Sequence, residues 1–463
     1  MGKGQLSSLS VIKTGPRARI LQQWGNTAVE NSIIDSSLYT KYDVKRGLRE
    51  ISGKGVLAGL TKIGEISAYT TDDKGQPIPQ PGELIYRGID INHLVEGFSS
   101  EGRLGFEETS FLLLFGRLPK KEELELFSHL LASKRRFPPG FVQSAILDMP
   151  GQDMMNAMSR GVLALYTYDK NADDTAIPNV LKQSLNLIAA FPLLAVYAYQ
   201  AYLRRYKNGS MVIHRPQKRL STAENILHML RPDSSYTRTE ARLLDLALVL
   251  HAEHGGGNNS SFTTHVVSSS GTDTYSAIVA ALASLKGPKH GGANVKSVDM
   301  LDNIKENVRD WKDDNEIERH LERILRKEAF DRSGLIYGVG HAVYSVSDPR
   351  AEILRIHARD LAKEKGLAEE FQLFTRVEEL APKVIGRVRK MYKGVCANVD
   401  FYSGFIYKML GIPEELNTPL FAIARIVGWS AHRIEELANG GKIIRPAYRS
   451  VSDRGVYVPM EER

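Results

Sequence analysis

Residues 275–294, YSAIVAALASLKGPKHGGAN, combine the two features that decide the fold and the chemistry of this chain. Apolar side chains at helical spacing fill 275–286, and a glycine followed by Pro288 then interrupts the pattern. Glycine commonly stands just past the end of a helix and proline cannot continue one, so the pattern predicts a helix ending at residue 286. His290 follows between lysine and two glycines, which allow a ligand or another backbone segment to approach its imidazole closely.

The same spacing of apolar residues at intervals of three and four recurs along the chain, and we expect a helix wherever it does. The stretches concerned are 111–115, the segment after Pro119, 241–250, 316–327 and 351–365. Residues 185–203 are strongly apolar but contain polar residues and a proline, which favours a buried core helix over a membrane span. Strand signals are limited to a hairpin candidate between residues 56 and 87 and a short piece at 456–458. The chain is therefore predicted to be mainly α, with minor β pieces.

Composition narrows the class of protein. The 463 residues carry a net charge of +7 and one cysteine, Cys396, which excludes an intrachain disulfide and fits a reducing cytosol. A mild positive charge suits small polyanionic ligands, and the absence of basic runs argues against nucleic-acid binding. The first 19 residues lack the apolar segment of a secretory signal. We therefore expect a cytoplasmic protein that binds neither nucleic acid nor membranes.

Several potential metal ligands gather in LHAEHGGGNNSSFTTH at 250–265. They are His251, Glu253, His254 and His265. A catalytic zinc site needs three protein ligands and an open position, but HExxH is absent and the glycines at 255–257 are expected to end the helix. We expect no metal, with a zinc hydrolase as an alternative. Each histidine is either a buried imidazole bonded to backbone or a substrate contact, and His254, beside the glycines, is the better candidate for substrate.

A second glycine–histidine segment is YGVGHAVYSVSDPR at 337–350. It contains His341, and the Asp-Pro pair near its end is a typical start of a helix, so Arg350 is predicted to lie in the first helical turn. A positive charge there opposes the helix dipole, which hints that Arg350 forks onto a carboxylate. Taken alone, His341 is equally an ordinary loop histidine and Arg350 an ordinary surface arginine.

Asp400 lies between apolar residues in NVDFYSG at 398–404. An apolar setting raises the pKa of a carboxyl group, which would make Asp400 a general base. Spacing alone makes it equally plausible as the N-cap of a helix over 401–410. No phosphate-binding glycine loop and no nucleophile motif accompany these residues, so proton transfer near an anionic substrate is the chemistry that remains.

The motifs GPKHGGAN, GVGHAVYSVSDPRA, NVDFYSG and ARIVGWSAHRIEE, with YRGIDINHLVEG upstream, resemble the citrate synthase family in order and spacing. The resemblance covers most of the chain. It implies a homodimer of mainly α subunits, each with a large domain (1–290 and 394–463) and a small domain (291–393) that close to exclude water. It also implies Claisen-type condensation of acetyl-CoA with oxaloacetate and hydrolysis of the citryl thioester to citrate and CoA. Acetyl-CoA is then a substrate, and no cofactor is expected.

The same resemblance assigns roles to individual residues. Asp400 resembles the base that removes a methyl proton from the thioester, His290 the group that stabilises the thioester oxygen, and His341 the acid that polarises the ketone. The residues that resemble contacts to the keto acid or to CoA are His254, Arg350, Arg425, Arg445 from a neighbouring subunit and, for CoA phosphate, Arg46. His251 matches the first histidine of the His254 motif. Ser345 departs from relatives that have a basic CoA contact there, and the basic stretch 204–219 is a hypothetical replacement.

Two further functions remain open from the sequence. A 2-methylcitrate synthase would use propionyl-CoA in the same chemistry, and a single methylene is worth only about 1–3 kcal/mol of discrimination. No motif decides between the two acyl donors. A non-catalytic regulator that binds anions or CoA would keep the arginines but would not need Asp400.

Overall fold

The computed structural model describes residues 16–50, 55–73, 77–340, 343–390 and 394–463. The chain forms two compact units, Met1–Ala58 and Gly59–Arg463. The first contains α1 (Pro16–Ser32), α2 (Ser36–Lys41) and a 3-10 turn, η1 (Arg46–Leu48). Within this unit the exposed guanidinium group of Arg46 lies over the ring of Tyr39, 4.4 Å from its centroid.

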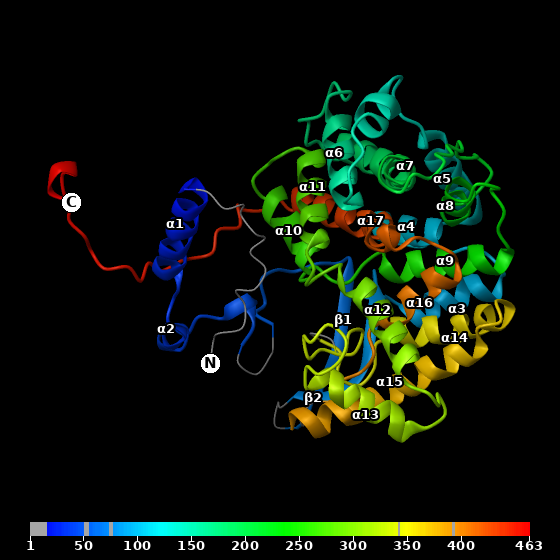
Figure 1. The fold of residues 1–463 in the computed structure, drawn as a ribbon. Coiled ribbons are helices and arrows are strands. Elements are labelled where there is room, and N and C mark those ends of the chain that lie inside the picture. Colours follow the sequence, from blue (N-terminus) through cyan, green and yellow to red (C-terminus); the bar gives the residue numbers. More distant parts are fainter. Residues whose placement is uncertain (1–15, 51–54, 74–76, 341–342, 391–393) are drawn as a thin grey trace. The chain divides into compact units, whose positions relative to one another are not determined.

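The second unit is mainly helical and begins with a small sheet (Figure 1). Its strands are β1 (Gly64–Thr71), β2 (Pro77–Tyr86) and β3 (Ile89–Asp90). Its α-helices are α3 (Ile91–Ser100), α4 (Phe106–Phe115), α5 (Lys121–Lys134), α6 (Met154–Tyr166), α7 (Ile177–Tyr206), α8 (Thr222–Leu230), α9 (Arg238–His251), α10 (Asn259–Ser268), α11 (Thr274–Lys286), α12 (Ala293–Asn307), α13 (Asp314–Leu325), α14 (Pro349–Glu364), α15 (Ala368–Arg389), α16 (Val399–Met409) and α17 (Asn417–Ala438). Short helical turns are η2 (Val142–Leu147, π-helical), η3 (Glu414–Leu416) and η4 (Met460–Glu462). The mainly α prediction is confirmed.

The predicted hairpin is also confirmed. Strands β1 and β2 pair antiparallel from Gly64 opposite Tyr86, with a register shift between Ser67 and Tyr69, and β3 adds to the edge of β2. The second β prediction is wrong, because residues 456–458 form no strand. An extended segment needs a neighbouring strand to satisfy its backbone groups, and none pairs with it in the part of the chain that the structure describes.

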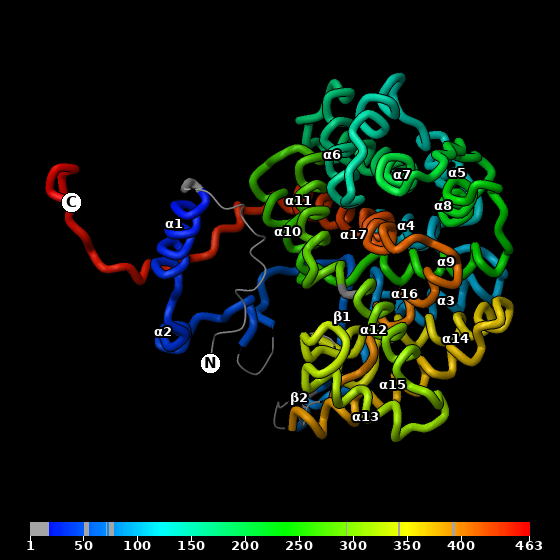
Figure 2. The backbone as a smooth tube through the Cα atoms, in the orientation of Figure 1, coloured from blue at the N-terminus to red at the C-terminus, as the bar shows by residue number. Residues whose placement is uncertain are grey.

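Helices α16 and α17 run through the middle of the second unit, as the backbone trace in Figure 2 shows. Helix α17 packs against α7, α10 and α11, whereas α16 packs against α12 and α14. The side chain of Trp429 on α17 is completely buried. Helix α7 is the single described helix long and apolar enough to cross a membrane, but 83% of its most apolar window is buried in the protein, as the core-helix prediction requires.

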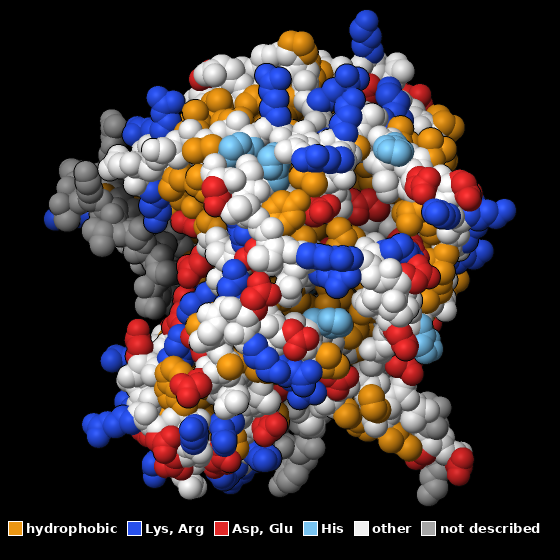
Figure 3. All heavy atoms as spheres, turned by 90° about the vertical axis from the view of Figure 1, so that its right-hand side faces the viewer, with side chains coloured by type: hydrophobic (Ala, Val, Ile, Leu, Met, Phe, Trp, Pro, Cys, Tyr) orange, Lys and Arg blue, Asp and Glu red, His pale blue; other side chains and the backbone are white. Residues whose placement is uncertain are grey.

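Surface charge is mixed on the face seen in Figure 3. Blue lysine and arginine side chains outnumber red acidic ones in the upper part of this view, whereas blue and red side chains are interspersed in the lower part.

Candidate active site

Asp400 lies at the start of α16. The side chain of Asn398 caps this helix by accepting a hydrogen bond from the backbone N–H of Asp400 at 2.9 Å. The helix therefore begins at Val399, and the alternative interpretation of Asp400 as the N-cap is wrong. The cap is supplied two residues earlier, which leaves the carboxylate of Asp400 without a hydrogen-bonding partner among the described residues.

Burial raises the pKa of Asp400 to about 7. The positive charges of Arg350 and Arg425 oppose this rise, and the negative charge of Asp348 adds to it. A carboxylate with a pKa near the working pH is both available and basic, which is the combination that a general base needs. The apolar neighbours of Asp400 in the sequence predicted a raised pKa, and burial does raise it.

The segment before His341 runs beside the segment before Asp400. The backbone N–H of Gly340 donates to Cys396 O at 2.7 Å, and Asn398 N donates to the carbonyl of Gly338 at 2.8 Å. The amide of Asn398 also donates to Gly340 O at 2.8 Å. Two motifs that are far apart in the sequence thus form a short antiparallel pairing.

This pairing requires glycine at position 338. Its φ is 75°, and a Cβ atom would lie 2.6 Å from Ser297 Oγ and 2.9 Å from Phe401 Cα. A side chain would therefore separate the loop from α16. His341 itself lies outside the described residues, so its role stays a prediction.

Arg350 lies in the first turn of α14, as predicted. It forms a two-pronged ion pair with Asp348, through Nε at 3.0 Å and Nη2 at 2.7 Å, and both side chains are buried. The carboxylate fork expected of Arg350 is thus made within the chain, and Nη1 takes part in neither bond. Burial alone would lower the pKa of Arg350, but Asp348 raises it above its usual range.

Asp348 also connects two helices. It accepts a hydrogen bond from Arg350 N at 3.0 Å, which caps α14, and one from Val399 N at 3.3 Å at the start of α16. The positive ends of both helix dipoles therefore converge beside Asp400 and Arg350. This arrangement favours negative charge at the site.

Buried groups without partners surround Arg425. Its Nε donates to the backbone carbonyl of His251 at 2.6 Å, whereas Nη1 has no partner among the described residues. Both ring nitrogens of His251 are also buried without partners, and the ring stacks on Phe421 at 3.6 Å. Burial and the charges of Arg350 and Arg425 lower the pKa of His251, which keeps it neutral. Each unmet buried group costs about 1–3 kcal/mol, so a polar ligand that satisfied them would bind favourably.

His290 lies in the turn after α11, which ends at Lys286 as predicted. The Nε2 atom is 3.1 Å from Ser260 Oγ, which also accepts from the indole N–H of Trp429 at 3.0 Å. Burial, followed by the charge of Arg425, lowers the pKa of His290 to about 4. The imidazole is therefore neutral at neutral pH.

The glycines around His290 serve backbone packing. Gly287 has a φ of −58°, so the helix ends there without a left-handed residue and Pro288 accounts for the stop. A Cβ atom at Gly291 would lie 2.4 Å from Leu285 O. The sequence left open whether a ligand or another backbone segment approaches these glycines. At Gly291 it is the backbone that approaches.

His254 is buried just after α9. Its ring meets that of Tyr344 edge to face, with centroids 5.8 Å apart, and the guanidinium group of Arg350 lies 5.8 Å from the same tyrosine ring. Tyr344 therefore links His254 to Arg350. This places His254 in the neighbourhood that the sequence predicted for it.

Three other predicted residues form no hydrogen bond or ion pair with Asp400, Arg350 or Arg425 among the described residues. Arg445 is exposed in the segment after α17, and Arg46 belongs to the first compact unit. Ser345 is buried, and its hydroxyl has no partner among the described residues. The basic stretch 204–219 forms hydrogen bonds with nearby residues such as Gln200, and among the described residues none of its hydrogen bonds or ion pairs reaches Asp400.

Sequence reasoning missed the partner of Glu253. This fully buried carboxylate bonds to His432 Nε2 at 3.0 Å. Burial alone would raise the pKa of Glu253, but His432 and Arg425 bring it below its usual value. The available signal was Gly428 inside ARIVGWSAHRIEE, because a Cβ atom there would lie 2.3 Å from the Glu253 carboxylate. A glycine in a helix interior marks such close approach.

A carboxyl group with a high pKa, neutral imidazoles and buried guanidinium groups in one neighbourhood define an enzyme that moves protons on a small anionic substrate. A sequence model of the family described as "Citrate synthase, C-terminal domain" matches residues 50–447. The chain belongs to the citrate synthase family.

Known proteins resemble the chain over most of its length. It is 35% identical over 428 residues to the citrate synthase of Haloferax volcanii, covering 91% of this chain and 99% of that protein. It is 32% identical over 422 residues to 2-methylcitrate synthase 1 of Corynebacterium glutamicum, covering 89% and 100%. The citrate synthase of Thermoplasma acidophilum, solved as a ternary complex with carboxymethyl coenzyme A and oxaloacetate, matches with a TM-score of 0.70 at 26% identity, covering 91% of this chain and 99% of that chain.

The high pKa of Asp400 leads to a pH prediction. A base must be deprotonated to accept a proton, so we expect kcat/KM for the thioester to fall about tenfold per pH unit below pH 7. Initial rates measured from about pH 5 to pH 8 at saturating keto acid test this expectation. A profile without any fall in rate between pH 7 and pH 5 would show that no group with this pKa must lose its proton.

Proposed function

We propose that this protein condenses acetyl-CoA with oxaloacetate and hydrolyses the resulting citryl thioester, which gives citrate and CoA. The observation that carries the proposal is the raised pKa of Asp400 beside the buried guanidinium groups of Arg350 and Arg425. The base suits removal of a proton next to a thioester carbonyl. The guanidinium groups suit the carboxylates of a keto acid.

In the first step Asp400 takes a methyl proton from acetyl-CoA. The electron pair of the broken C–H bond forms the enol, and charge develops on the thioester oxygen. His290 stabilises that oxygen as a neutral hydrogen-bond donor, held in place by Ser260.

In the second step the enol carbon attacks the ketone carbon of oxaloacetate, and His341 protonates the ketone oxygen. The unpaired Nη1 atom of Arg425, together with Arg350 and His254, binds the carboxylates of the keto acid. Water then attacks the thioester carbonyl and CoA leaves as its thiol. One proton of the attacking water restores His341, and the proton held by Asp400 passes to the departing CoA thiolate, so both groups return to their initial protonation states. The new carboxyl group of citrate releases its proton to solvent.

The proposed site is completed by a residue from a second copy of the chain. We propose a homodimer in which Arg445 completes the site of a second copy. The exposed apolar side chains of Ile443, Tyr448 and Val456 near Arg445 support a surface that another chain covers. We also propose that the small domain, 291–393, closes on the large domain, 1–290 and 394–463, with Arg46 contacting CoA phosphate. We also propose that the protein acts in the cytoplasm, whose reducing conditions fit its single cysteine.

A second candidate acyl donor is propionyl-CoA, because the chain also resembles 2-methylcitrate synthase 1 of C. glutamicum. We expect kcat/KM with oxaloacetate to favour acetyl-CoA over propionyl-CoA by about 10–200-fold, the range that one methylene provides. Thiol release from both thioesters, measured on one enzyme preparation, gives the ratio. A preference for propionyl-CoA would replace citrate by 2-methylcitrate as the product.

The same assay separates an enzyme from a regulator. Thiol release that requires oxaloacetate, with citrate formed in equal amount, supports the proposed reaction. A regulator that only binds CoA or anions would retain both ligands without releasing thiol. Thiol release without oxaloacetate, accompanied by a stoichiometric bound metal, would instead indicate a hydrolase.

A further inference from the structure

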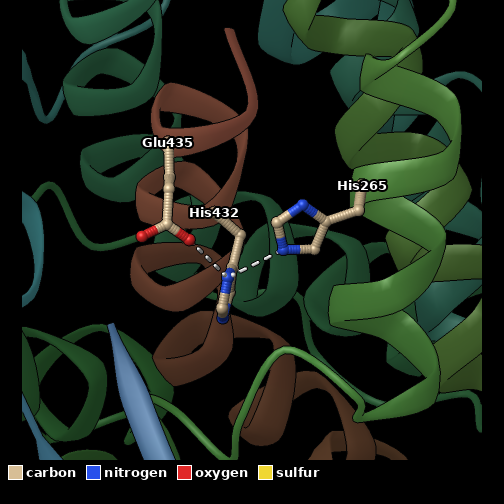
Figure 4. Close-up of side chains that lie close together, drawn as sticks. All are labelled: His265, His432 and Glu435. Atoms are coloured by element: carbon tan, nitrogen blue, oxygen red, sulfur yellow. Dashed lines mark hydrogen bonds and ion pairs between the residues drawn. The ribbon is translucent and has the colours of Figure 1, made fainter. Parts of the chain in front are cut away.

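Two histidines and two glutamates form a cluster where α10 meets the end of α17. His265 comes from α10, and His432, Glu435 and Glu436 follow one another along α17. Spacings of three and four place Glu435 and Glu436 on the same side of the helix as His432. Figure 4 shows the ring of His265 and the carboxylate of Glu435 both directed at one nitrogen of His432. None of these residues has a role in the proposed reaction.

The two imidazoles are linked to each other and to one carboxylate each. His432 Nδ1 lies 3.0 Å from His265 Nε2. The opposite nitrogen of His432, Nε2, lies 3.0 Å from Glu253 Oε2, and the opposite nitrogen of His265, Nδ1, lies 2.8 Å from Glu436 Oε2. The result is a row of four groups, Glu253–His432–His265–Glu436.

With both imidazoles neutral and both carboxyl groups ionised, this row lacks one proton. Its three links need three protons, but two neutral imidazoles bring only two. Ionised Glu253 and Glu436 can only accept, so His432 uses Nε2–H for the first and His265 uses Nδ1–H for the second. The lone pairs of Nδ1 on His432 and Nε2 on His265 then face each other at 3.0 Å. A cation between them removes the repulsion.

Glu435 supplies a third electron-rich atom at the same point. Its Oε2 is buried without a hydrogen-bonding partner among the described residues and lies 4.0 Å from His432 Nδ1. Its other oxygen, Oε1, accepts from the backbone N–H of Lys62 at 2.8 Å, which fixes the carboxylate in place. A buried carboxylate oxygen with no donor is costly unless a cation neutralises it.

We propose that His265 Nε2, His432 Nδ1 and Glu435 bind a divalent transition metal of the zinc type. One potential ligand atom from each of these residues lies within 4.8 Å of the others. Zinc–nitrogen bonds of about 2.0–2.1 Å at tetrahedral angles place two nitrogens roughly 3.4 Å apart, so the rings need to separate by only a few tenths of an ångström. Two imidazoles and one carboxylate favour zinc over magnesium or calcium, which prefer oxygen ligands.

The surroundings match what metal-binding histidines require. Each ring donates its other N–H to a carboxylate, Glu253 for His432 and Glu436 for His265, which fixes the ring that binds the metal. Gly256 leaves space beside the pair, since a Cβ atom there would lie 3.7 Å from His265 Nε2. That space suits a water molecule as the fourth ligand.

This metal site differs from the one that the sequence analysis considered within residues 250–265. The expectation of no metal concerned His251, Glu253, His254 and His265 in a single segment, whereas here His265 combines with residues from a helix far along the chain. The metal would tie α10 to α17, and Glu253 would connect it to the neighbourhood of His254. Its role is structural, so its failure would leave the proposed reaction of Asp400 unaffected.

The experiment measures metal binding by the full-length protein after removal of metals with a chelator. Calorimetric titration with Zn²⁺ is expected to give about one equivalent per chain, and Co²⁺ is expected to give the visible absorption of a tetrahedral nitrogen-ligated ion. His265→Gln should abolish this binding and the absorption band. Glu436→Gln keeps the hydrogen-bond acceptor but loses its charge, so the affinity should fall about 10–100-fold.

His320→Gln is the matched control. His320 is another buried histidine, bonded through Nε2 to Asn303 at 3.1 Å and remote in sequence from the cluster, so this variant should bind Zn²⁺ like the wild type. Zn²⁺ should also raise the melting temperature of the wild type and of His320→Gln, but not that of His265→Gln. Wild-type protein that binds no stoichiometric Zn²⁺, or His265→Gln that binds as well as wild type, would overturn the proposal. Wild-type protein without Zn²⁺ binding would mean that the rings of His265 and His432 share a proton instead of a metal ion.

Discussion

Replacing Asp400 by asparagine is expected to lower kcat by about 10²–10⁴-fold, the contribution typical of a general base. Asparagine has nearly the same shape but cannot accept the methyl proton. The carboxylate forms no hydrogen bond among the described residues, so its removal breaks no bond that holds α16 in place. The KM for oxaloacetate should therefore change little. Thiol release and citrate formation measure the effect.

Stability gives a second measurement on the same variant. The folded-state pKa of Asp400, about 7, lies above the ordinary carboxyl value of 3.8, so the folded protein binds this proton more tightly than the unfolded chain. Wild-type stability from this group is present at low pH and is lost as the pH rises through about 7. Asp400→Asn should lack that loss and should unfold at a higher temperature than wild type above pH 7.

Asp360→Asn is the matched control for the kinetic effect. Asp360 is exposed on α14, 3.7 Å from Arg359, and its replacement should leave kcat within about twofold of wild type. Asp400→Asn protein that melts cooperatively but retains the wild-type rate of thiol release would refute the assignment of the base.

Replacing Asp348 by alanine is expected to destabilise the protein by about 3–5 kcal/mol, because it leaves the guanidinium group of Arg350 buried without its counter-ion. The variant also loses the cap of α14 and the bond to Val399 N. Equilibrium unfolding in denaturant, or the shift in melting temperature where unfolding is irreversible, measures this effect.

Asp313→Ala separates the buried ion pair from the helix cap. Asp313 caps α13 by accepting from Asn315 N at 2.9 Å, but it lies near the surface, so its loss should cost only about 0.5–2 kcal/mol. The excess loss in Asp348→Ala is the joint contribution of the pair with Arg350 and the bond to Val399 N. Equal losses in the two variants would mean that this pair adds nothing beyond capping.

Local sequence patterns predicted local structure well. Apolar periodicity located helix α11 to within one residue at its start, and the Asp-Pro pair placed Arg350 in the first turn of α14. These features depend on residues within one or two turns of each other. The exact cap of α16 was not decided by pattern, because Asn398 and Asp400 are both good N-cap residues and the choice depends on packing.

Contacts between distant segments could not be read in this way. Glu253 and His432 are far apart in the sequence, and each alone resembles an ordinary polar residue near a helix end. The sequence did not show that Asp348, two residues away, is the carboxylate on which Arg350 forks. The contact of Arg350 with the keto acid stays a prediction. The family resemblance joined the distant motifs into one site, whereas composition and spacing left His290 and Asp400 each with an ordinary alternative.

The pairing of Gly340 with Cys396 has a consequence for how this protein tolerates insertions. This hydrogen bond joins the two ends of the segment between Gly340 and Cys396. The middle of that segment, including α15, can therefore change in length without altering the register at Asp400. An extra residue between Asn398 and Asp400 has the opposite effect, because each helical residue turns the chain by about 100° and would point the carboxylate away from Arg350. Differences in length among related proteins should therefore accumulate around α15 and be absent from the paired segments at Gly340 and Cys396.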